Sequence, residues 1–426
     1  MTAGGGFGWI PAFAAMTGAA VACSRFPAAA LPFTELGQVN AMNPTDTAVP
    51  KSASARWSAQ APDAPGAAAG RATLRIGPIG LTGPFVQAAL SGYSDAPMRR
   101  LARRYGCPYA LNEVVLDRLV LQGGRAMRRD LALAADDHPV GGQLMGAEPE
   151  QFAAAADHLV GLGYDVIDVN FGCPVRKVLN RCRGGYLLSD PATAVEILRR
   201  VRDAVGIRVP VTVKMRRGLD DTPESERNFF AILDAAFELG LAAVTVHGRT
   251  VRQRYVGPSQ WGFLARVKRH VGDRTVLGSG DAFTAGACVR MMEETGVDGV
   301  SVARGAIGNP WIFGEAEALR RGEPLPDPPT IQAQRRAIEE HHALMSETHG
   351  AERAPALLRK FGVRYSELHP YPAEVKRAFL SVRTTDDWRA MLYRWYDPQG
   401  DWPAVVRRDR PESLIAAGAA WDCAEA

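Results

Sequence analysis

The sequence predicts an α/β fold, a (β/α)8 TIM barrel followed by a small all-helical domain towards the C-terminus. The length of 426 residues exceeds one ordinary core of about 150 residues but suits a barrel of about 250 residues plus a smaller module. From about residue 77, short β-branched or apolar runs alternate with longer amphipathic segments, as repeated βα units do. Beyond the proline-rich connection at 323–330, apolar residues recur only at helical spacing.

Composition divides the chain into four segments. Residues 1–76 are rich in Ala, Gly, Pro, Ser and Thr without a sustained period, and we expect a disordered extension. Residues 77–322 carry the βα pattern and form the expected barrel. Residues 328–396 form the expected helical domain, and 397–426, which mix Pro, Arg and Asp, form an expected loose tail.

The barrel is expected to contain eight strands joined by helices. The strand ranges are 84–90, 108–115, 139–145, 166–171, 210–215, 242–247, 274–279 and 298–303, and helices are expected at 149–163, 191–206, 224–240 and 283–296. Right-handed crossovers would close such strands into a barrel whose functional residues lie at the strand C-terminal ends. The alternative is an open doubly wound sheet, but SGYSDAP after the first strand does not supply its GxGxxG fingerprint.

Composition also limits the class of protein. Hydrophobic residues make up 46% and charged residues 23%, which is typical of soluble globular proteins, and no run of about 18 uncharged apolar residues predicts a membrane span. The net charge of +4 permits nucleic acid binding without requiring it. The six cysteines show no CxxC and no zinc-binding spacing, and the N-terminus lacks the basic start of a signal peptide. We therefore expect a cytoplasmic protein without a metal.

Polar side chains occur where the expected strands end. After the fourth strand, Cys173 stands between a glycine and a proline, which would hold a thiol at the barrel mouth, although an isolated cysteine is more often structural. Lys214 ends the apolar fifth strand, where an unpaired amine is rare, and His247 ends the sixth. Gln143, near the end of the third, carries an amide that can donate to and accept from the edge of a heteroaromatic ring.

Glycine-rich loops follow the last two expected strands. Ser279, Gly280 and Asp281 come after the seventh strand, and Arg304 and Gly305 come after the eighth. Exposed backbone N–H groups backed by a helix start favour an anion, so we expect a phosphate site, although glycines can also simply make tight turns. Together with the polar residues at the third, fifth and sixth strand ends, these loops could surround one flavin mononucleotide (FMN), whose anionic reduced ring the lysine would stabilise.

Five runs in this order, DVNFGCPVRKV, VTVKMRRG, VTVHGRT, GSGD and VARGAIGNPWIF, resemble the tRNA-dihydrouridine synthases over residues 80–395. The resemblance implies an FMN-containing barrel with a C-terminal helical domain that reduces particular uridines of tRNA, usually with NADPH as electron source. It implies that Cys173 donates the proton to uracil C5 and that Asn170 and Arg249 face the substrate base. It also implies flavin ligands at Gln143, Lys214, His247 and the backbone around Gly280, Arg304 and Gly305.

Two positions depart from the family pattern. Ala89 and Leu90 stand where a Pro-Met pair usually lies beneath the flavin, and Ser279 stands where an asparagine is usual. Neither change removes an indispensable group. An apolar side chain can still contact the ring, and the loop backbone is still available.

Transfer RNA binding would require cations near the barrel mouth and on the helical domain. Arg176 and Lys177 follow Cys173, and Arg359 and Lys360 cluster in LLRKFGVRY, so we expect these four residues to contact tRNA, although a charge run can be only a solvated surface. The target nucleotide would have to leave the RNA stack to reach the flavin. Two alternatives are an FMN barrel acting on a small molecule such as an enone, and a non-enzymatic RNA-binding protein. A monomer is expected.

Overall fold

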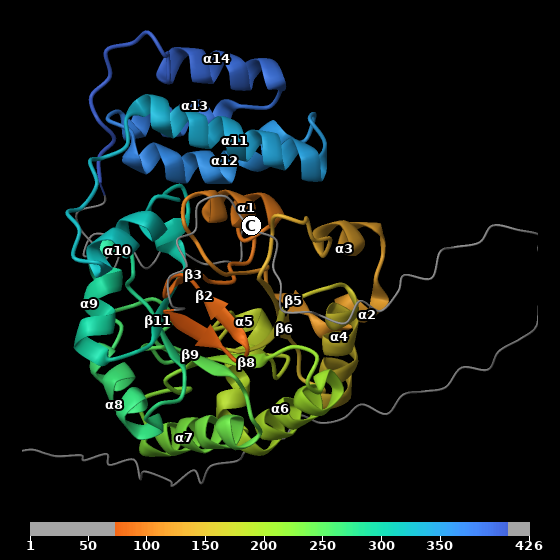
Figure 1. Ribbon diagram of the computed structural model, residues 1–426. Coiled ribbons are helices and arrows are strands. Elements are labelled where there is room, and N and C mark those ends of the chain that lie inside the picture. The colour runs from red at the N-terminus through yellow and green to blue at the C-terminus, as the bar shows by residue number, and fades with distance from the viewer. Residues whose placement is uncertain (1–72, 408–426) are drawn as a thin grey trace, which may run out of the picture. The chain divides into compact units, whose positions relative to one another are not determined.

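The computed structural model describes residues 73–407 (Figure 1). The expected disordered extension lies outside the described residues up to position 72, as does the expected loose tail from position 408. In the described part, a barrel with surrounding helices is followed by a group of four helices. The fold class expected from the sequence is therefore confirmed.

Eight parallel strands close the barrel. They run in the order β4, β3, β11, β10, β9, β8, β7, β6, and a further pairing of β4 with β6 completes the ring. Their bounds are β3 (Phe85–Gln87), β4 (Ala110–Leu111), β6 (Val140–Met145), β7 (Val166–Phe171), β8 (Val211–Arg216), β9 (Ala243–His247), β10 (Val276–Ser279) and β11 (Gly299–Val302). Each lies within one residue of, or inside, a range expected from the sequence. The expected second strand is split, because β4 is followed after a break by β5 (Val115–Leu116), which pairs with β6.

Helices surround the barrel (Figure 1). They are α1 (Ala96–Arg104), α4 (Pro149–Gly161), α6 (Pro191–Val205), α7 (Pro223–Glu238), α8 (Trp261–Val271), α9 (Ala285–Thr295) and α10 (Ile312–Arg320), with the shorter α2 (Asp117–Gln122), α3 (Arg125–Asp130) and α5 (Arg176–Leu179) in loops. Their starts follow capping chemistry: the Asp190 and Thr222 side chains accept hydrogen bonds from the first turns of α6 and α7, and a proline follows each of these two caps.

Two segments differ from the sequence-based expectation. β1 (Leu74–Ile76) pairs with β2 (Ile79–Leu81) in an antiparallel hairpin, although β1 falls in the stretch expected to be disordered. Leu74 and Ile76 are buried against the barrel core, and a three-residue strand is too short for its alternation to be recognised. Towards the other end, Val405 is buried and its N–H donates to Pro329 O at 3.1 Å, so this part of the expected loose tail is packed.

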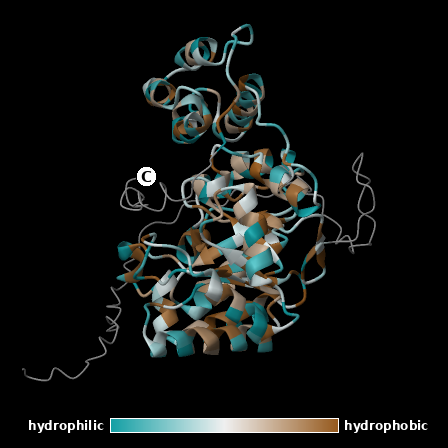
Figure 2. Ribbon diagram, turned by 90° about the vertical axis from the view of Figure 1, so that its left-hand side faces the viewer, coloured by the Kyte–Doolittle hydropathy of each residue, from teal (hydrophilic) through white to brown (hydrophobic). Residues whose placement is uncertain are grey.

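The helical domain consists of α11 (Ile331–His349), α12 (Ala354–Tyr365), α13 (Pro372–Ser381) and α14 (Thr385–Trp395). Each helix has hydrophobic and hydrophilic sides (Figure 2), and Leu358 and Phe379 are fully buried in its core. α11 packs on α1 of the barrel, where Arg100 pairs with Glu347 at 2.9 Å. The first barrel helix is therefore the support on which the helical domain rests.

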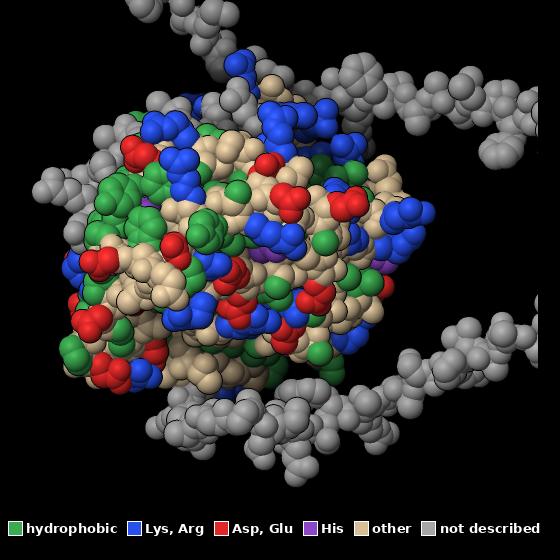
Figure 3. Space-filling view, turned by 90° about the horizontal axis from the view of Figure 1, so that it is seen from above, with side chains coloured by type: hydrophobic (Ala, Val, Ile, Leu, Met, Phe, Trp, Pro, Cys, Tyr) green, Lys and Arg blue, Asp and Glu red, His purple; other side chains and the backbone are tan. Residues whose placement is uncertain are grey.

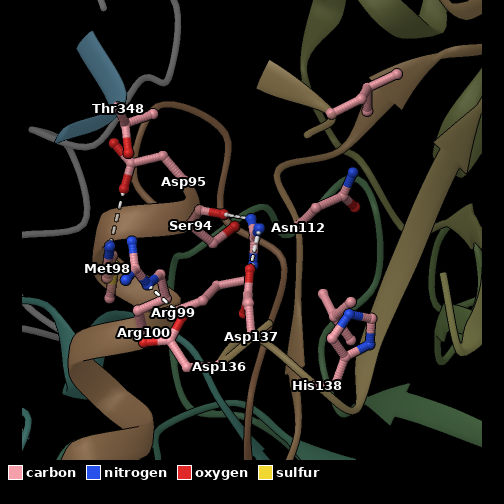
Figure 4. Close-up of polar contacts among 12 residues, drawn as sticks. Ser94, Asp95, Met98, Arg99, Arg100, Asn112, Asp136, Asp137, His138 and Thr348 are labelled. Carbon is pink, nitrogen blue, oxygen red and sulfur yellow. Dashed lines mark hydrogen bonds and ion pairs between the residues drawn. The ribbon is translucent and has the colours of Figure 1, made fainter. Parts of the chain in front are cut away.

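A buried ion pair fixes α1 to the loop before β6 (Figure 4). Arg99 and Asp137 are both fully buried, and the Arg99 Nη2 lies 2.5 Å from Asp137 Oδ2. Arg99 Nη1 also donates to Ser94 O at 2.9 Å, and Arg103 Nη2 donates to Pro139 O at 2.5 Å. The guanidinium of Arg99 thus ties together three chain segments: α1, the loop before it and the loop before β6.

Asp137→Asn is expected to lower the free energy of unfolding by about 3–5 kcal/mol, because it leaves the Arg99 charge buried without its counter-charge. The matched control is Asp136→Asn, which removes a half-exposed carboxylate from Arg100 and should cost less than about 1 kcal/mol. Urea titration followed by tryptophan fluorescence measures both. Equal decreases in the free energy of unfolding of the two variants would contradict the role of the buried ion pair.

Candidate functional site

A cavity of about 300 Å³ lies at the C-terminal ends of the barrel strands. Residues from strands on all sides converge on it, as barrel geometry requires. Its wall includes nine residues that the sequence singles out: Gln143, Asn170, Cys173, Lys214, His247, Ser279, Gly280, Asp281 and Arg304. The positional argument from strand ends therefore brings together most of the expected site.

A chain of buried hydrogen bonds supports the cavity floor. Gln143 Nε2 donates to Asp168 Oδ2 at 2.7 Å, and Asn170 Nδ2 donates to Gln143 Oε1 at 2.7 Å. Thr212 Oγ1 donates to the other oxygen of Asp168 at 2.5 Å. Burial raises the pKa of Asp168, and the hydrogen bonds from Thr212 and Gln143 oppose that rise. The amides of Gln143 and Asn170 are thereby held in one orientation.

The loop that carries Cys173 is held from two sides. Asn170 Oδ1 accepts from the N–H groups of Gly172 at 2.9 Å and Cys173 at 3.1 Å, so this side chain shapes the turn. From the other side, Arg216 Nε donates to Gly172 O at 2.9 Å. Gly184, at φ +57°, approaches so closely that an added Cβ would lie 2.9 Å from the Cys173 Cβ. The thiol is thus fixed on the cavity wall by its surroundings.

Positive charge is concentrated beside this thiol. Burial, followed by the neighbouring Arg216 charge, lowers the pKa of Lys214 to about 8, while Asp168 and Cys173 act in the opposite direction. Burial also lowers the pKa of Arg216 to about 10. An anionic ligand would relieve both groups, because an opposite charge favours the charged form of a base.

His247 is held as a neutral hydrogen-bond donor. Burial, then the charges of Arg216, Lys214, Arg249 and Arg304, lower the pKa of His247 well below its ordinary value. Its Nδ1 accepts from the Arg249 N–H at 3.1 Å, which assigns the remaining ring proton to Nε2. A neutral imidazole with this tautomer can donate one hydrogen bond into the cavity.

The loops after β10 and β11 pack closely against neighbouring protein atoms. Gly280 has φ +105°, and a Cβ there would lie 2.4 Å from Ser259 Oγ. A Cβ on Gly305, which is buried behind the cavity wall, would lie 2.3 Å from Ala282 O. Ser301 Oγ is buried beside the cavity without a hydrogen-bond partner among the described residues. Glycine is required at both loop positions by close packing against these protein atoms.

Arg249, unlike most of the site residues expected from the sequence, lies outside the cavity wall. Its side chain is fully buried, pairs with Asp281 at 2.7 Å and donates to Gly257 O at 2.8 Å, and it does not line the cavity. Asp281 Oδ2 also accepts from the Ser259 N–H at 2.7 Å. Arg249 and Asp281 therefore hold the loop after β10 in place.

The four cations expected to contact tRNA lie in two places. Arg176 and Lys177 are exposed on α5, next to the Cys173 loop. Arg359 and Lys360 are half-buried on α12, and the Lys360 Nζ lies 5.5 Å from the centre of the Tyr93 ring. Because Tyr93 lines the cavity, Lys360 connects the helical domain to the cavity wall.

Sequence reasoning missed several cavity residues besides Tyr93, among them Arg216 and Tyr255. Arg216 lies two positions after Lys214 on β8, so strand alternation places both on one side, a signal that was present in the sequence. Tyr255 lies in the loop after β9, with its ring centre 5.3 Å from the Arg216 guanidinium and 4.8 Å from that of Arg304. No strand end marks its position, so only the folded loop reveals it.

A family model for dihydrouridine synthase matches residues 86–392. The chain belongs to the dihydrouridine synthase family. A probable tRNA-dihydrouridine synthase of Mycobacterium tuberculosis is 36% identical over 337 residues, covering 75% of this chain and 84% of the relative. The tRNA-dihydrouridine synthase B of Pseudomonas aeruginosa is 35% identical over 324 residues, covering 76% and 96%. This dihydrouridine synthase is accordingly a flavin-dependent oxidoreductase.

Solved structures of lower similarity were also found. A complex of 2-naphthoyl-CoA reductase is 12% identical, with a TM-score of 0.47, and covers 59% of this chain and 52% of that one. Morphinone reductase in complex with tetrahydroNAD is 14% identical, with a TM-score of 0.42, and covers 60% and 91%. Between residues 73 and 407, no helix is long and apolar enough to cross a membrane, and no three His, Cys, Asp or Glu side chains are grouped to hold a metal.

Lys214→Met is expected to stabilise the flavin-free protein at pH 7 by about 1–3 kcal/mol, because the charged ammonium is unfavourable in the cavity. The pKa of Lys214 is about 8 in the folded protein and 10.5 ordinarily, so the unfolded chain binds the proton more tightly between these pH values. The free energy of unfolding of the wild type therefore rises relative to that of the variant from pH 8 to 10.5. Above this range the stability advantage of Lys214→Met has disappeared.

Urea titrations of both proteins across this pH range measure the difference. Lys177→Met serves as the control, because that side chain is exposed on α5. A stability advantage of Lys214→Met that does not change with pH would show that the lysine charge is not its cause.

Proposed function

We propose that this dihydrouridine synthase holds FMN in the barrel cavity and reduces the C5–C6 double bond of particular uridines in tRNA, with Cys173 as the proton donor and NADPH as the electron source. The observation that carries the proposal is the convergence of a fixed thiol and Lys214 on the wall of one cavity at the strand C-terminal ends. An acid and a cation on the wall of one cavity suit the reduction of an enone, which gains a proton at one carbon and negative charge at its carbonyl.

The residues present fit a flavin. The proton on His247 Nε2 and the buried, unpartnered Ser301 Oγ supply hydrogen bonds, and Lys214 supplies a charge for an anionic ring. Gly280, on the cavity wall, and the loop at Arg304 and Gly305 would supply backbone N–H groups to a phosphate. The flavin, when bound, supplies the hydride for uracil C6. Ala89 and Leu90 line the cavity, so apolar contact with the ring is retained where the family usually has Pro-Met.

Cys173 would then complete the reaction on the uracil. Cysteine thiols ordinarily keep their proton at neutral pH, and the loop that carries this one is positioned by Asn170 and Arg216. Negative charge that develops on the uracil C4 carbonyl needs a nearby donor. Because Arg249 is buried away from the cavity, we assign this role to Arg216 or Lys214, which both line it.

The substrate would approach over the cations outside the cavity. Arg176 and Lys177 beside the Cys173 loop, and Arg359 and Lys360 on α12, are proposed to contact tRNA phosphates. The uridine is extruded from its stack into the cavity, because the thiol lies on the cavity wall. We further propose that the enzyme acts as a monomer in the cytoplasm, where NADPH and tRNA meet.

Cys173→Ala is expected to retain bound flavin and NADPH oxidation but to form at least about a hundredfold less dihydrouridine, within the range that a general acid contributes. Nucleoside mass spectrometry of tRNA incubated with the purified enzyme measures the product. The control is Cys182→Ala, which removes a thiol from the same loop and should leave turnover within about twofold.

Full dihydrouridine formation by Cys173→Ala would overturn the acid role. Wild-type enzyme that oxidises NADPH and reduces a free enone, but forms no dihydrouridine in any tRNA, would favour a small-molecule flavoenzyme. Flavin binding without any NADPH oxidation would favour a non-enzymatic RNA-binding protein.

A further inference from the structure

A short basic helix projects from the barrel between β5 and β6. α3 reads RAMRRD and follows Gly123 and Gly124, which have φ values of +65° and +108°. Met127 packs against the core, whereas Arg125 and Arg128 are exposed and form no ion pair with any residue in the described range. The helix therefore exposes two guanidinium groups that have no ion pair in the described range.

The cations of α3 adjoin cations of the helical domain. His349, at the end of α11, has its pKa lowered first by burial and then by the charges of Arg129, Arg353 and Lys360, with Asp130 opposing. These groups come from α3, the α11–α12 connection and α12, so the two parts of the protein meet at this corner. The acidic residues there include Asp130, which pairs with Arg129, the exposed Glu352, and Asp95, whose carboxylate interacts with the Lys360 charge.

One of these cations, Lys360, lies next to a residue of the cavity wall. The Lys360 ammonium lies over the Tyr93 ring, and the Tyr93 ring meets the Phe361 ring edge-on at 5.4 Å. Tyr93 lines the cavity that receives the uridine under the proposed function. Figure 3 looks down on the helical side of the molecule and shows Lys and Arg side chains predominating along the upper and right-hand edges of this face.

We propose that α3, through Arg125 and Arg128, forms with Arg353 and Lys360 a surface that binds the phosphodiester backbone of the RNA strand next to the extruded nucleotide. The inference rests on the proposed function and adds a barrel element to its RNA-binding surface. Exposed guanidinium groups bind phosphate oxygens bidentately, and a row of them follows a polyanion. A membrane surface fits less well, because the one large apolar residue of α3, Met127, faces the core and leaves no apolar side for insertion.

The test compares two double variants of the full-length holoenzyme. Arg125→Gln with Arg128→Gln removes two charges from α3, and Arg227→Gln with Arg269→Gln removes two exposed charges from α7 and α8, on the side of the barrel away from the helical domain (Figure 1). The dissociation constant for dihydrouridine-free bulk tRNA is measured against salt concentration, with flavin content and melting temperature recorded for each protein.

The α3 variant is expected to bind tRNA about tenfold or more weakly at about 0.1 M salt, with the slope of log K against log salt reduced by up to about two, because two phosphate contacts are lost. Its KM for tRNA should rise, while kcat at saturating tRNA stays within about threefold. The α7–α8 variant should keep the wild-type affinity and slope to within about twofold. Equal effects in the two variants would overturn the inference.

Two further readouts separate the possible failures. Loss of binding to phosphatidylserine vesicles by the α3 variant, with tRNA affinity unchanged, would show that the surface meets a membrane and would overturn the inference. Dihydrouridine formation by the wild type is measured in parallel. Its absence would contradict the proposed function, whereas the binding comparison would still decide the role of α3.

Discussion

The carboxylate of Asp168 anchors the site. It accepts from Gln143 and Thr212, Gln143 accepts from Asn170, and Asn170 accepts from the backbone of the Cys173 loop. Every link is buried or nearly so, and an amide turned the wrong way would leave polar groups unpaired at a cost of about 1–3 kcal/mol each. Strands β6, β7 and β8 are thus coupled to the position of one thiol, and the barrel serves as a rigid frame for chemistry at its mouth.

The same cavity holds charge at a cost to stability. Lys214 and Arg216 lie in a site that disfavours their charged forms, beside a histidine kept neutral. Such groups are unfavourable in an empty cavity and become favourable when an anionic ligand is bound, which is a common property of functional sites. Arg216 has a second role, because its hydrogen bonds to Gly172 O and Thr250 O connect the loops after β7 and β9.

The sequence was sufficient for the barrel because parallel strands are buried on both sides and stand out as apolar runs, as at 166–171, which coincides with β7. It did not predict the break between β4 and β5, where Asn112 accepts from the Gln143 N–H and Glu113 accepts from the Gly92 N–H instead of continuing a ladder. The sequence also did not predict where the Arg249 side chain points, because its partner Asp281 is 32 residues away. Spacing identifies a strand end, whereas ion pairs between distant loops decide where a long side chain points.

The central claim is that one cavity brings reduced flavin and an extruded uridine together, and a single-turnover experiment tests it most directly. The purified flavoprotein is reduced without oxygen, freed of nicotinamide and mixed with dihydrouridine-free tRNA, and flavin reoxidation is followed by absorbance while dihydrouridine is counted by mass spectrometry. The account predicts one dihydrouridine for each flavin reoxidised. Flavin that stays reduced in the presence of tRNA, or reoxidation without a matching amount of dihydrouridine, would contradict it.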